Sequence, residues 1–216
     1  MFKGKVLLFS LVLLFATSLY AGDVDECKST AGTSCALRVS CCPQGDFEFV
    51  REGCGGDADY IWVEIHDASD IGIAGIPWTD YWMGACVPHP EYLLCFCPGG
   101  IIADSLTNED GRTTFSGRLA GGGCVLSGGL WISCQGKILV EPGPCTEPVC
   151  IDLVIVSVDI NGTCKVELGD LSFFSDSYNQ NEGDPDYDDC ADWNDDNKVN
   201  LSDFSFLGEH YDHECF

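Results

Sequence analysis

The sequence predicts a mainly β protein, in which a cysteine-rich β-sandwich comes first and a small helical unit follows. Three observations lead to this prediction. Short alternating segments separated by turn residues fill most of the chain before residue 158. The 216 residues include 15 Cys, a content typical of a disulfide framework formed in an oxidising compartment. The last third contains a repeat with a period of 33 residues, and a helical pattern follows each copy.

The charge of the chain is strongly negative, with 35 acidic against 10 basic residues and a net charge of −25. Such a chain has no basic face, so it is not expected to bind nucleic acid. Residues 22–150 carry 18 acidic and 6 basic residues, whereas residues 151–216 carry 17 and 2. This change in composition predicts a domain boundary at residue 150.

The first 21 residues have the layout of a secretory signal peptide. Lys3 and Lys5 precede an apolar run over residues 6–16, and the small residues Ala21 and Gly22 follow. The apolar run is shorter than the roughly 20 residues of a membrane-spanning helix, and no second run of spanning length exists. The mature chain is therefore expected to be secreted, either extracellular or at the cell surface, without a membrane span.

The segment 22–150 is expected to form strands. In residues 60–66, Ile61, Val63 and Ile65 alternate with polar or aromatic residues, which predicts a strand with one buried face. The sequence Asn-Glu-Asp-Gly at residues 108–111 predicts a turn. Further strands are predicted over residues 46–52, 113–115, 129–134, 137–140 and 151–158, and Gln135-Gly136 predicts a hairpin between 129–134 and 137–140. No helical period of useful length precedes residue 168.

Parts of this segment resemble immunoglobulin-like (Ig-like) β-sandwiches of bacterial surface proteins, of the invasin-type and carboxypeptidase-regulatory-like groups. The resemblance involves residues 61–65, the Gly-Ile-Ala-Gly-Ile-Pro stretch at 72–77, and the turn and strand at 107–115. It implies a spacer or adhesion module without catalytic activity. The many cysteines and residues 80–84 depart from the common pattern of these groups.

The repeat contains the candidate metal-binding residues. Residues 159–170 and 192–203 both follow D-x-N-x-[DT]-x-K-V-x-L-x-D, with oxygen-bearing side chains at positions one, three, five and twelve. This is the spacing of an EF-hand calcium loop, which wraps the ion with alternate side chains and the carbonyl of position seven. The sequence thus predicts two calcium sites. The predicted ligands are Asp159, Asn161, Thr163, Lys165 and Asp170 in the first loop and Asp192, Asn194, Asp196, Lys198 and Asp203 in the second, the lysines through their carbonyls.

One short helix is expected after each loop, with apolar stripes formed by Leu171, Phe174 and Tyr178 and by Phe204, Leu207 and Tyr211. The two stripes are expected to cover each other, and no helix is expected before either loop. A duplicated loop-plus-helix unit resembles the type I dockerin module over residues 158–214. The resemblance implies calcium binding and attachment to a cohesin-like scaffold protein.

Some residues depart from that family pattern. Position six, normally Gly, is Cys164 or Asn197, and Thr163 supplies a neutral ligand, so the first site is expected to bind calcium more weakly. Cohesin-binding dockerins usually have Ser or Thr at positions ten and eleven, where this chain has Leu-Gly at 168–169 and Leu-Ser at 201–202. Cohesin docking is therefore kept as an alternative function.

The cysteines divide into 12 in residues 22–150 and three in the tail, Cys164, Cys190 and Cys215. Three cannot pair among themselves, so one tail cysteine is expected to be free, to pair with the first segment, or to pair between chains. The dockerin resemblance implies that Cys215 lies near the first loop and pairs with Cys164.

No catalytic motif is present, so the protein is expected not to be an enzyme. The four histidines are His66, His89, His210 and His213. The stretch 210–214, which holds two of them, can bind a metal, but a solvated, fraying terminus is the preferred interpretation. The aromatic residues Trp62, Trp78, Tyr81 and Trp82 either stack on sugars, if exposed, or fill the core.

The sequence therefore predicts a secreted, calcium-binding, non-catalytic structural or adhesive module of the cell surface or of an extracellular assembly. Three alternatives remain open. The first is a subunit that assembles with itself, as a homo-oligomer, an extracellular filament or a surface layer. The second is attachment to a cohesin-like scaffold in a polysaccharide-processing system. The third is a glycan-binding accessory module.

Overall fold

The computed structural model describes residues 22–34, 37–45, 61–87, 92–116, 119–140 and 145–215. This part of the chain is mainly β, with many short strands and two α-helices. The predicted signal peptide, the predicted strand at residues 46–52 and His89 lie outside the described residues. The elements are β1 (Thr30–Thr33), β2 (Leu37–Cys41), β3 (Ile61–Glu64), β4 (Tyr81–Ala85), β5 (Cys95–Phe96), β6 (Arg112–Phe115), β7 (Gly121–Gly122), β8 (Leu130–Cys134), β9 (Lys137–Ile138), β10 (Leu153–Ser157), α1 (Leu168–Ser177), β11 (Gln180–Asn181), the 3-10 helix η1 (Asp189–Ala191), β12 (Lys198–Val199) and α2 (Leu201–His210).

The first sheet is antiparallel, in the order β1-β3-β6. The alternation predicted for β3 is confirmed, because Ile61, Val63 and Ile65 are buried. The predicted turn before β6 is also present: the Gly111 amide donates to the Asn108 carbonyl over 2.9 Å. Gly111 has φ of +77°, a conformation that glycine adopts without a steric cost.

The second sheet is antiparallel, in the order β4-β8-β9. The predicted hairpin is confirmed, and its two turn residues, Gln135 and Gly136, have φ of +51° and +80°. Two successive residues with positive φ match the right-handed twist of the flanking strands. The strand β4 falls in the stretch that departs from the Ig-like pattern.

The two sheets share one apolar core, as expected for a β-sandwich-like arrangement. Tyr81 of β4 meets Phe115 of β6 edge to face, with ring centroids 5.2 Å apart. Val63 and Ile65 lie in the same buried cluster as Ile132 of β8. Alternation on each strand supplies the apolar face, and the shared core holds the two sheets together.

Strand β10 links this core to a second one. It pairs in parallel with β2, and its residues alternate between two apolar clusters. Leu153 and Ile155 point into the first cluster, whereas Val156 belongs to the second. The domain boundary at residue 150 remains a prediction. The strand that follows it, β10, pairs with β2 of the first segment.

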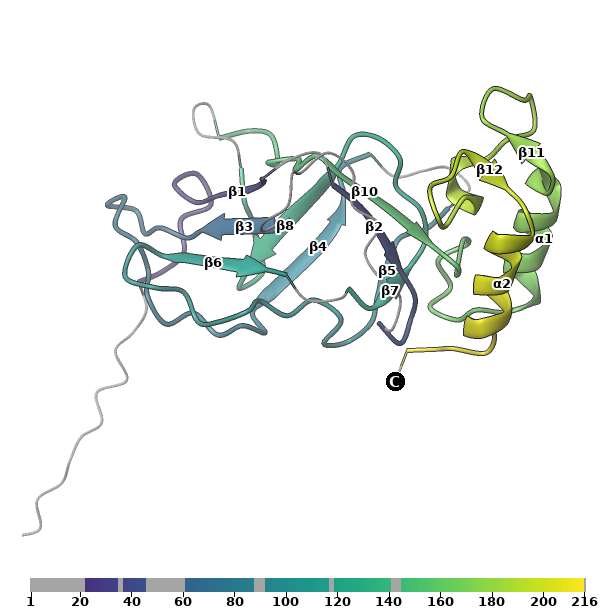
Figure 1. Ribbon diagram of the computed structural model, residues 1–216. Coiled ribbons are helices and arrows are strands. Elements are labelled where there is room, and N and C mark those ends of the chain that lie inside the picture. Colours follow the sequence, from purple (N-terminus) through teal and green to yellow (C-terminus); the bar gives the residue numbers. More distant parts are fainter. Residues whose placement is uncertain are drawn as a thin grey trace, which may run out of the picture.

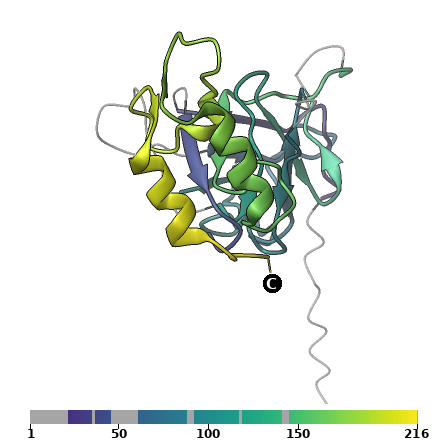
Figure 2. The same ribbon diagram turned by 90° about the vertical axis from the view of Figure 1, so that its right-hand side faces the viewer.

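The second core belongs to the helical unit, which lies at the end of the molecule away from β1, β3 and β6 (Figure 1). Viewed toward that end, α1 and α2 lie side by side in front of the strands (Figure 2). Phe174 of α1 stacks on Trp193 at 5.2 Å, and Leu207 of α2 is buried in the same cluster. Both predicted helices are confirmed.

Two details of the helical unit differ from expectation. The stripes do not fully cover each other: Phe174 and Leu207 are the only buried members of their stripes, and both pack in the cluster that contains Trp193. The short η1 precedes the second loop, where no helix was predicted. Asp188 caps it by accepting a hydrogen bond from the Cys190 amide. No helix among the described residues is long and apolar enough to cross a bilayer.

Candidate metal centre

The two predicted loops have the same backbone. Three pairs of residues 33 positions apart share a left-handed conformation, with φ between 57° and 68°: Gly162 and Asp195, Cys164 and Asn197, and Asn179 and Asp212. Side-chain-bearing residues rarely adopt this conformation, so the sequence repeat is also a structural repeat. Position six of each loop makes the sharp turn that its predicted role requires, although neither loop has Gly there.

The two halves exchange backbone hydrogen bonds. The Asn179 amide, after α1, donates to the carbonyl of Val199 in the second loop over 2.7 Å. The equivalent Asp212 amide, after α2, donates to Val166 of the first loop over 2.9 Å. Each loop is thus held by the segment that follows the other helix, and the pair forms one folding unit.

The first loop closes around its terminal carboxylates. Asp159 accepts hydrogen bonds from the amides of Thr163 (3.1 Å) and Cys164 (2.8 Å). Asp170 accepts from the amides of Asn161 (3.2 Å) and Glu167 (2.8 Å). The first and twelfth side chains therefore meet across the loop, and Asp170 also caps α1.

The second loop repeats this arrangement. Asp192 accepts from the Asp196 amide over 3.2 Å, and Asp203 accepts from the amides of Asn194 (3.3 Å) and Asn200 (2.9 Å). Oxygens of Asp192, Asp196 and Asp203 lie within 4.8 Å of one another. Asn200, the ninth residue, is the N-cap of α2 and accepts from the Ser202 amide. Tyr187, which the loop pattern does not predict, donates to Asp192 over 2.8 Å.

The charges in both loops are crowded and buried. Asp159, Asp170, Asp192 and Asp203 have no exposed surface. Burial, with the neighbouring Asp170 carboxylate, raises the pKa of Asp159 to about 7. Burial also raises the pKa of Asp170, Asp192 and Asp203. Among the described residues, no basic side chain forms an ion pair with these four carboxylates, so a bound cation would relieve a real electrostatic cost.

The residues of each loop fit calcium in ligand type. Positions one, three and five each offer a side-chain oxygen, and the carbonyl of position seven faces the same region in the first loop, since the Thr163 hydroxyl donates to it over 3.2 Å. The Lys165 side chain turns away, toward Asp212 and Glu214 at 2.9 and 3.2 Å. Calcium prefers such hard oxygen ligands, and the second loop offers one carboxylate more than the first.

Arg38 anchors the second loop to the β-rich part. It is buried on β2, and its guanidinium lies 3.0 Å from Asp189 and 3.1 Å from Asp195. It also donates to the Asp192 carbonyl over 2.6 Å. No local sequence signal indicates this contact, because 151 or more residues separate the partners.

Replacing this anchor is expected to destabilise the protein. Arg38→Ala leaves a buried carbonyl and two carboxylates without their cation, which is expected to lower the free energy of unfolding by about 3 kcal/mol. The matched control is Arg112→Ala, because Arg112 is half exposed and pairs with Glu64 at 3.3 Å, for an expected loss of about 1 kcal/mol or less. Urea unfolding measures both. Equal losses would contradict the anchoring role.

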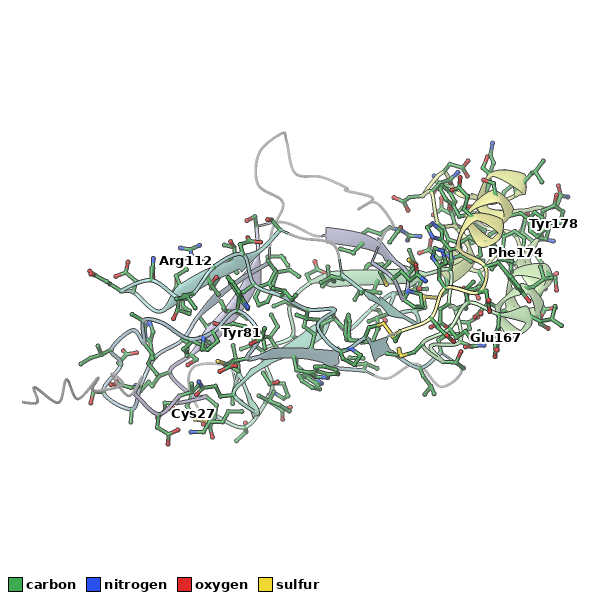
Figure 3. The ribbon with its side chains drawn as sticks, turned by 90° about the horizontal axis from the view of Figure 1, so that it is seen from below. Cys27, Tyr81, Arg112, Glu167, Phe174 and Tyr178 are labelled. Atoms are coloured by element: carbon green, nitrogen blue, oxygen red, sulfur yellow. A yellow bond between two sulfur atoms is a disulfide. The ribbon has the colours of Figure 1, made fainter. Side chains whose placement is uncertain are left out.

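Three disulfides join the tail to the rest of the chain. They are Cys95–Cys164, Cys97–Cys215 and Cys124–Cys190, and Figure 3 shows sulfur atoms at this junction. All three tail cysteines thus pair with the first segment, whereas at most one of them was expected to do so. Cys27–Cys145 and Cys86–Cys150 complete the described bridges. These five bridges agree with formation in an oxidising compartment.

The predicted Cys164–Cys215 pairing is wrong. The resemblance placed the two residues correctly, since the Cys215 amide donates to the Cys164 carbonyl over 3.1 Å. Their sulfur atoms bond instead to Cys95 and Cys97, which lie two residues apart at β5. The sequence alone does not indicate this pairing, because β5 is too short to stand out as a strand.

The expectation of a fraying C-terminus is also wrong. The Val166 amide donates to the His213 carbonyl over 2.8 Å, and Lys165 and Glu214 form a β-bridge. His210 is only 8% exposed. Pairing with the first loop and the bridge at Cys215 hold residues 211–215 in place.

The four aromatic residues proposed for sugar stacking differ in how exposed they are. Tyr81 is buried and fills the core, whereas Trp78 and Trp82 are 52% and 44% exposed. Trp62 packs under Arg112, with the guanidinium 5.3 Å from its ring centre. Two of the four remain available at the surface, and glycan binding stays a prediction.

The imidazole of His66, another of the four histidines, pairs with the Asp70 carboxylate at 3.0 Å.

Close packing against β7 sets the position of the first loop. A methyl group on Gly122 would overlap the Asp159 carboxylate. Gly122→Ala is therefore expected to displace the Asp159 carboxylate, the first predicted ligand, and to weaken the predicted calcium binding at the first loop by about tenfold, a cost within the range of overpacking. Isothermal titration calorimetry measures this affinity.

Gly208→Ala provides the control, because nothing lies near that position on α2 and Ala favours a helix. It is expected to leave both calcium affinities unchanged. An unchanged first site in Gly122→Ala would show that the contact with β7 does not position Asp159.

No protein-family model matches the sequence, and no curated protein matches it. Two crystal structures of interface mutants of a type II cohesin–X–dockerin complex from Acetivibrio cellulolyticus show some structural similarity. One chain is 12% identical with a TM-score of 0.27, over 86% of this chain and 96% of that chain. The other is 11% identical with a TM-score of 0.28, over 86% and 97%. Scores this low do not establish a common fold, so the function must be argued from the loops themselves.

Proposed function

We propose that this chain is a secreted, calcium-stabilised, non-catalytic module with a structural or adhesive role in an extracellular assembly or at the cell surface. In this proposal an Ig-like sandwich carries a dockerin-like unit with two calcium ions. One observation supports this proposal most strongly. Two loops with the same oxygen spacing have the same left-handed turn at position six and the same pattern of hydrogen bonds to the first and twelfth carboxylates.

Calcium would act as a structural ion. Asp159, Asn161, Thr163, the Lys165 carbonyl and Asp170 would hold the first ion, and the equivalent residues Asp192, Asn194, Asp196, Lys198 and Asp203 would hold the second. Each ion would neutralise buried carboxylates at the start of a helix, whose capping depends on the same Asp170 or Asp203. Binding energy is thereby converted into stability of the helical unit.

Circular dichroism of the full chain tests this proposal. With its disulfides intact, the protein is expected to lose helical signal when EDTA removes calcium and to regain it when calcium, but not magnesium at the same concentration, is restored. Helicity that does not respond to EDTA would contradict a folding role for calcium.

A second candidate function is docking onto a scaffold protein. It is supported by exposed apolar residues at equivalent positions of the two repeats: Leu168 and Leu201 are 68% and 67% exposed, and Tyr178 and Tyr211 are 46% and 51% exposed. Between α1 and α2 lies an apolar groove of about 330 Å³. Paired apolar patches on a solvent-facing surface are typical of interaction sites.

The test is binding of the calcium-loaded chain to an immobilised cohesin domain. Leu168→Asp with Leu201→Asp is expected to abolish binding while calcium affinity is retained. Absence of wild-type binding would remove the cohesin-like partner but leave the structural role intact.

A further inference from the structure

A cluster of thiol and imidazole side chains that could hold a metal ion lies outside the two repeated loops. It consists of Cys42, His210 and His213, and one ligand atom from each lies within 4.8 Å of the others. Cys42 directly follows β2, His210 is the last residue of α2, and His213 is in the C-terminal segment. The fold therefore brings Cys42 to two histidines that lie 168 or more positions further along the chain.

The local structure holds all three residues in place. Cys42 is fully buried, and its carbonyl accepts from the Gly121 amide over 3.0 Å. The His213 amide donates to the His210 carbonyl over 3.0 Å, and the Cys97–Cys215 bridge fixes the chain two residues later. Such preorganisation is what a metal site needs from its protein.

The ligand types and their spacing fit a tetrahedral transition metal. The Nδ1 atoms of His210 and His213 are 3.3 Å apart. Two imidazole nitrogens bound to Zn²⁺ at about 2.0–2.1 Å with tetrahedral angles lie about 3.3–3.4 Å from each other. Two imidazoles with a thiolate suit zinc or copper and do not suit calcium, which prefers oxygen.

The internal repeat shows that the fold does not require these histidines. The equivalent residues in the first half are Ser177, whose hydroxyl accepts from the Asp188 amide, and Gln180. The same backbone thus accommodates Ser and Gln at the two positions. The histidines occur only in the copy that faces Cys42.

We propose that Cys42, His210 and His213 bind one thiophilic transition-metal ion, of which Zn²⁺ is the representative, at the junction of the β-rich part and the helical unit. Three protein ligands leave a fourth position for water or another donor. The ion would bind when the Cys42 thiol releases its proton, and it would join the end of β2 to the end of α2. This inference does not depend on the calcium proposal.

The test uses Co²⁺ as a spectroscopic substitute for zinc. The full chain, with its disulfides intact, is treated with EDTA, returned to excess calcium and titrated with Co²⁺. We expect one equivalent, with tetrahedral cobalt bands and a thiolate-to-cobalt charge-transfer band, and we expect Zn²⁺ to displace the cobalt.

Three variants assign the ligands. Cys42→Ser is expected to lose the charge-transfer band, and His210→Ser and His213→Gln, which restore the residues of the first repeat, are expected to weaken binding at least about tenfold. Cys134→Ser, at another buried thiol, and His66→Asn serve as controls and should bind like the wild type. Circular dichroism and urea unfolding show whether each variant is folded.

The outcomes are distinct. If the two imidazoles only share a proton, no cobalt charge-transfer band appears in a folded chain, and the proposal is wrong. Cobalt binding that is unchanged in the Cys42 and histidine variants would place the ion elsewhere and overturn it as well.

Discussion

Calcium is expected to raise the melting temperature of the intact protein by about 10–20 °C, and the Asp170→Ala/Asp203→Ala double variant is expected to lose this shift. An ion at 100 times its dissociation constant stabilises a folded protein by about 2.7 kcal/mol. Two such ions contribute about 5 kcal/mol, and each kcal/mol corresponds to roughly 2–4 °C for a chain of this size. Thermal melting in calcium and in EDTA measures the shift.

The repeat offers a matched control for this prediction. Asp176 and Glu209 occupy equivalent positions on α1 and α2, are exposed, and lie outside the loops. Asp176→Ala/Glu209→Ala removes the same number of charges and should keep the full calcium shift. If both double variants lose the shift equally, net charge and not loop coordination explains the effect of calcium.

The Cys124→Ala/Cys190→Ala double variant is expected to lower the free energy of unfolding by about 4 kcal/mol. The bridge is buried and spans 66 residues, and the chain-entropy model gives a cost near this value for such a loop. Cys190 also lies two residues before Asp192. Its loss is therefore expected to weaken calcium binding at the second loop and to make the helical unit sensitive to protease.

The Cys86–Cys150 bridge is the comparison, because its sequence separation of 64 is nearly the same. Cys86→Ala/Cys150→Ala should show a similar loss in urea unfolding but unchanged calcium affinity. The anchoring role of Cys124–Cys190 is refuted if the two variants have the same calcium affinity and the same protease pattern.

Local sequence patterns predicted those strands, turns and loops whose structure depends on residues close together in the chain. The alternation of Ile61, Val63 and Ile65 indicated a strand, and the turn residues at 108–111 and 135–136 indicated reversals of the chain. The two repeated loops were also visible in the sequence, because their oxygen-bearing side chains are only two or a few positions apart. Loop closure and helix capping use the same residues, so one pattern encodes both.

Contacts over long sequence distances could not be predicted in this way. Arg38 reaches the second loop, and Cys42 meets His210, only because β2 pairs with β10 beside the helical unit. The disulfide partners of Cys164 and Cys215 likewise depend on where β5 lies. A single sequence has no periodicity or spacing that reports such contacts.

These features describe a small helical unit that several kinds of bond hold to a β-rich body. Three disulfides and the buried Arg38 cross the junction. Among the described residues, no basic side chain forms an ion pair with the four buried loop carboxylates, although the charge of Arg38 acts on Asp192. In our proposal calcium supplies the missing positive charge, and covalent bridges fix the folded unit in place.

The most direct test of this account is a calcium titration of the EDTA-treated full chain, with disulfides intact, by isothermal titration calorimetry. We predict two equivalents per chain, with the second loop binding more tightly, and one remaining equivalent in either Asp170→Ala or Asp203→Ala. A folded wild-type chain that binds no calcium, or that binds two ions regardless of these substitutions, would contradict the account.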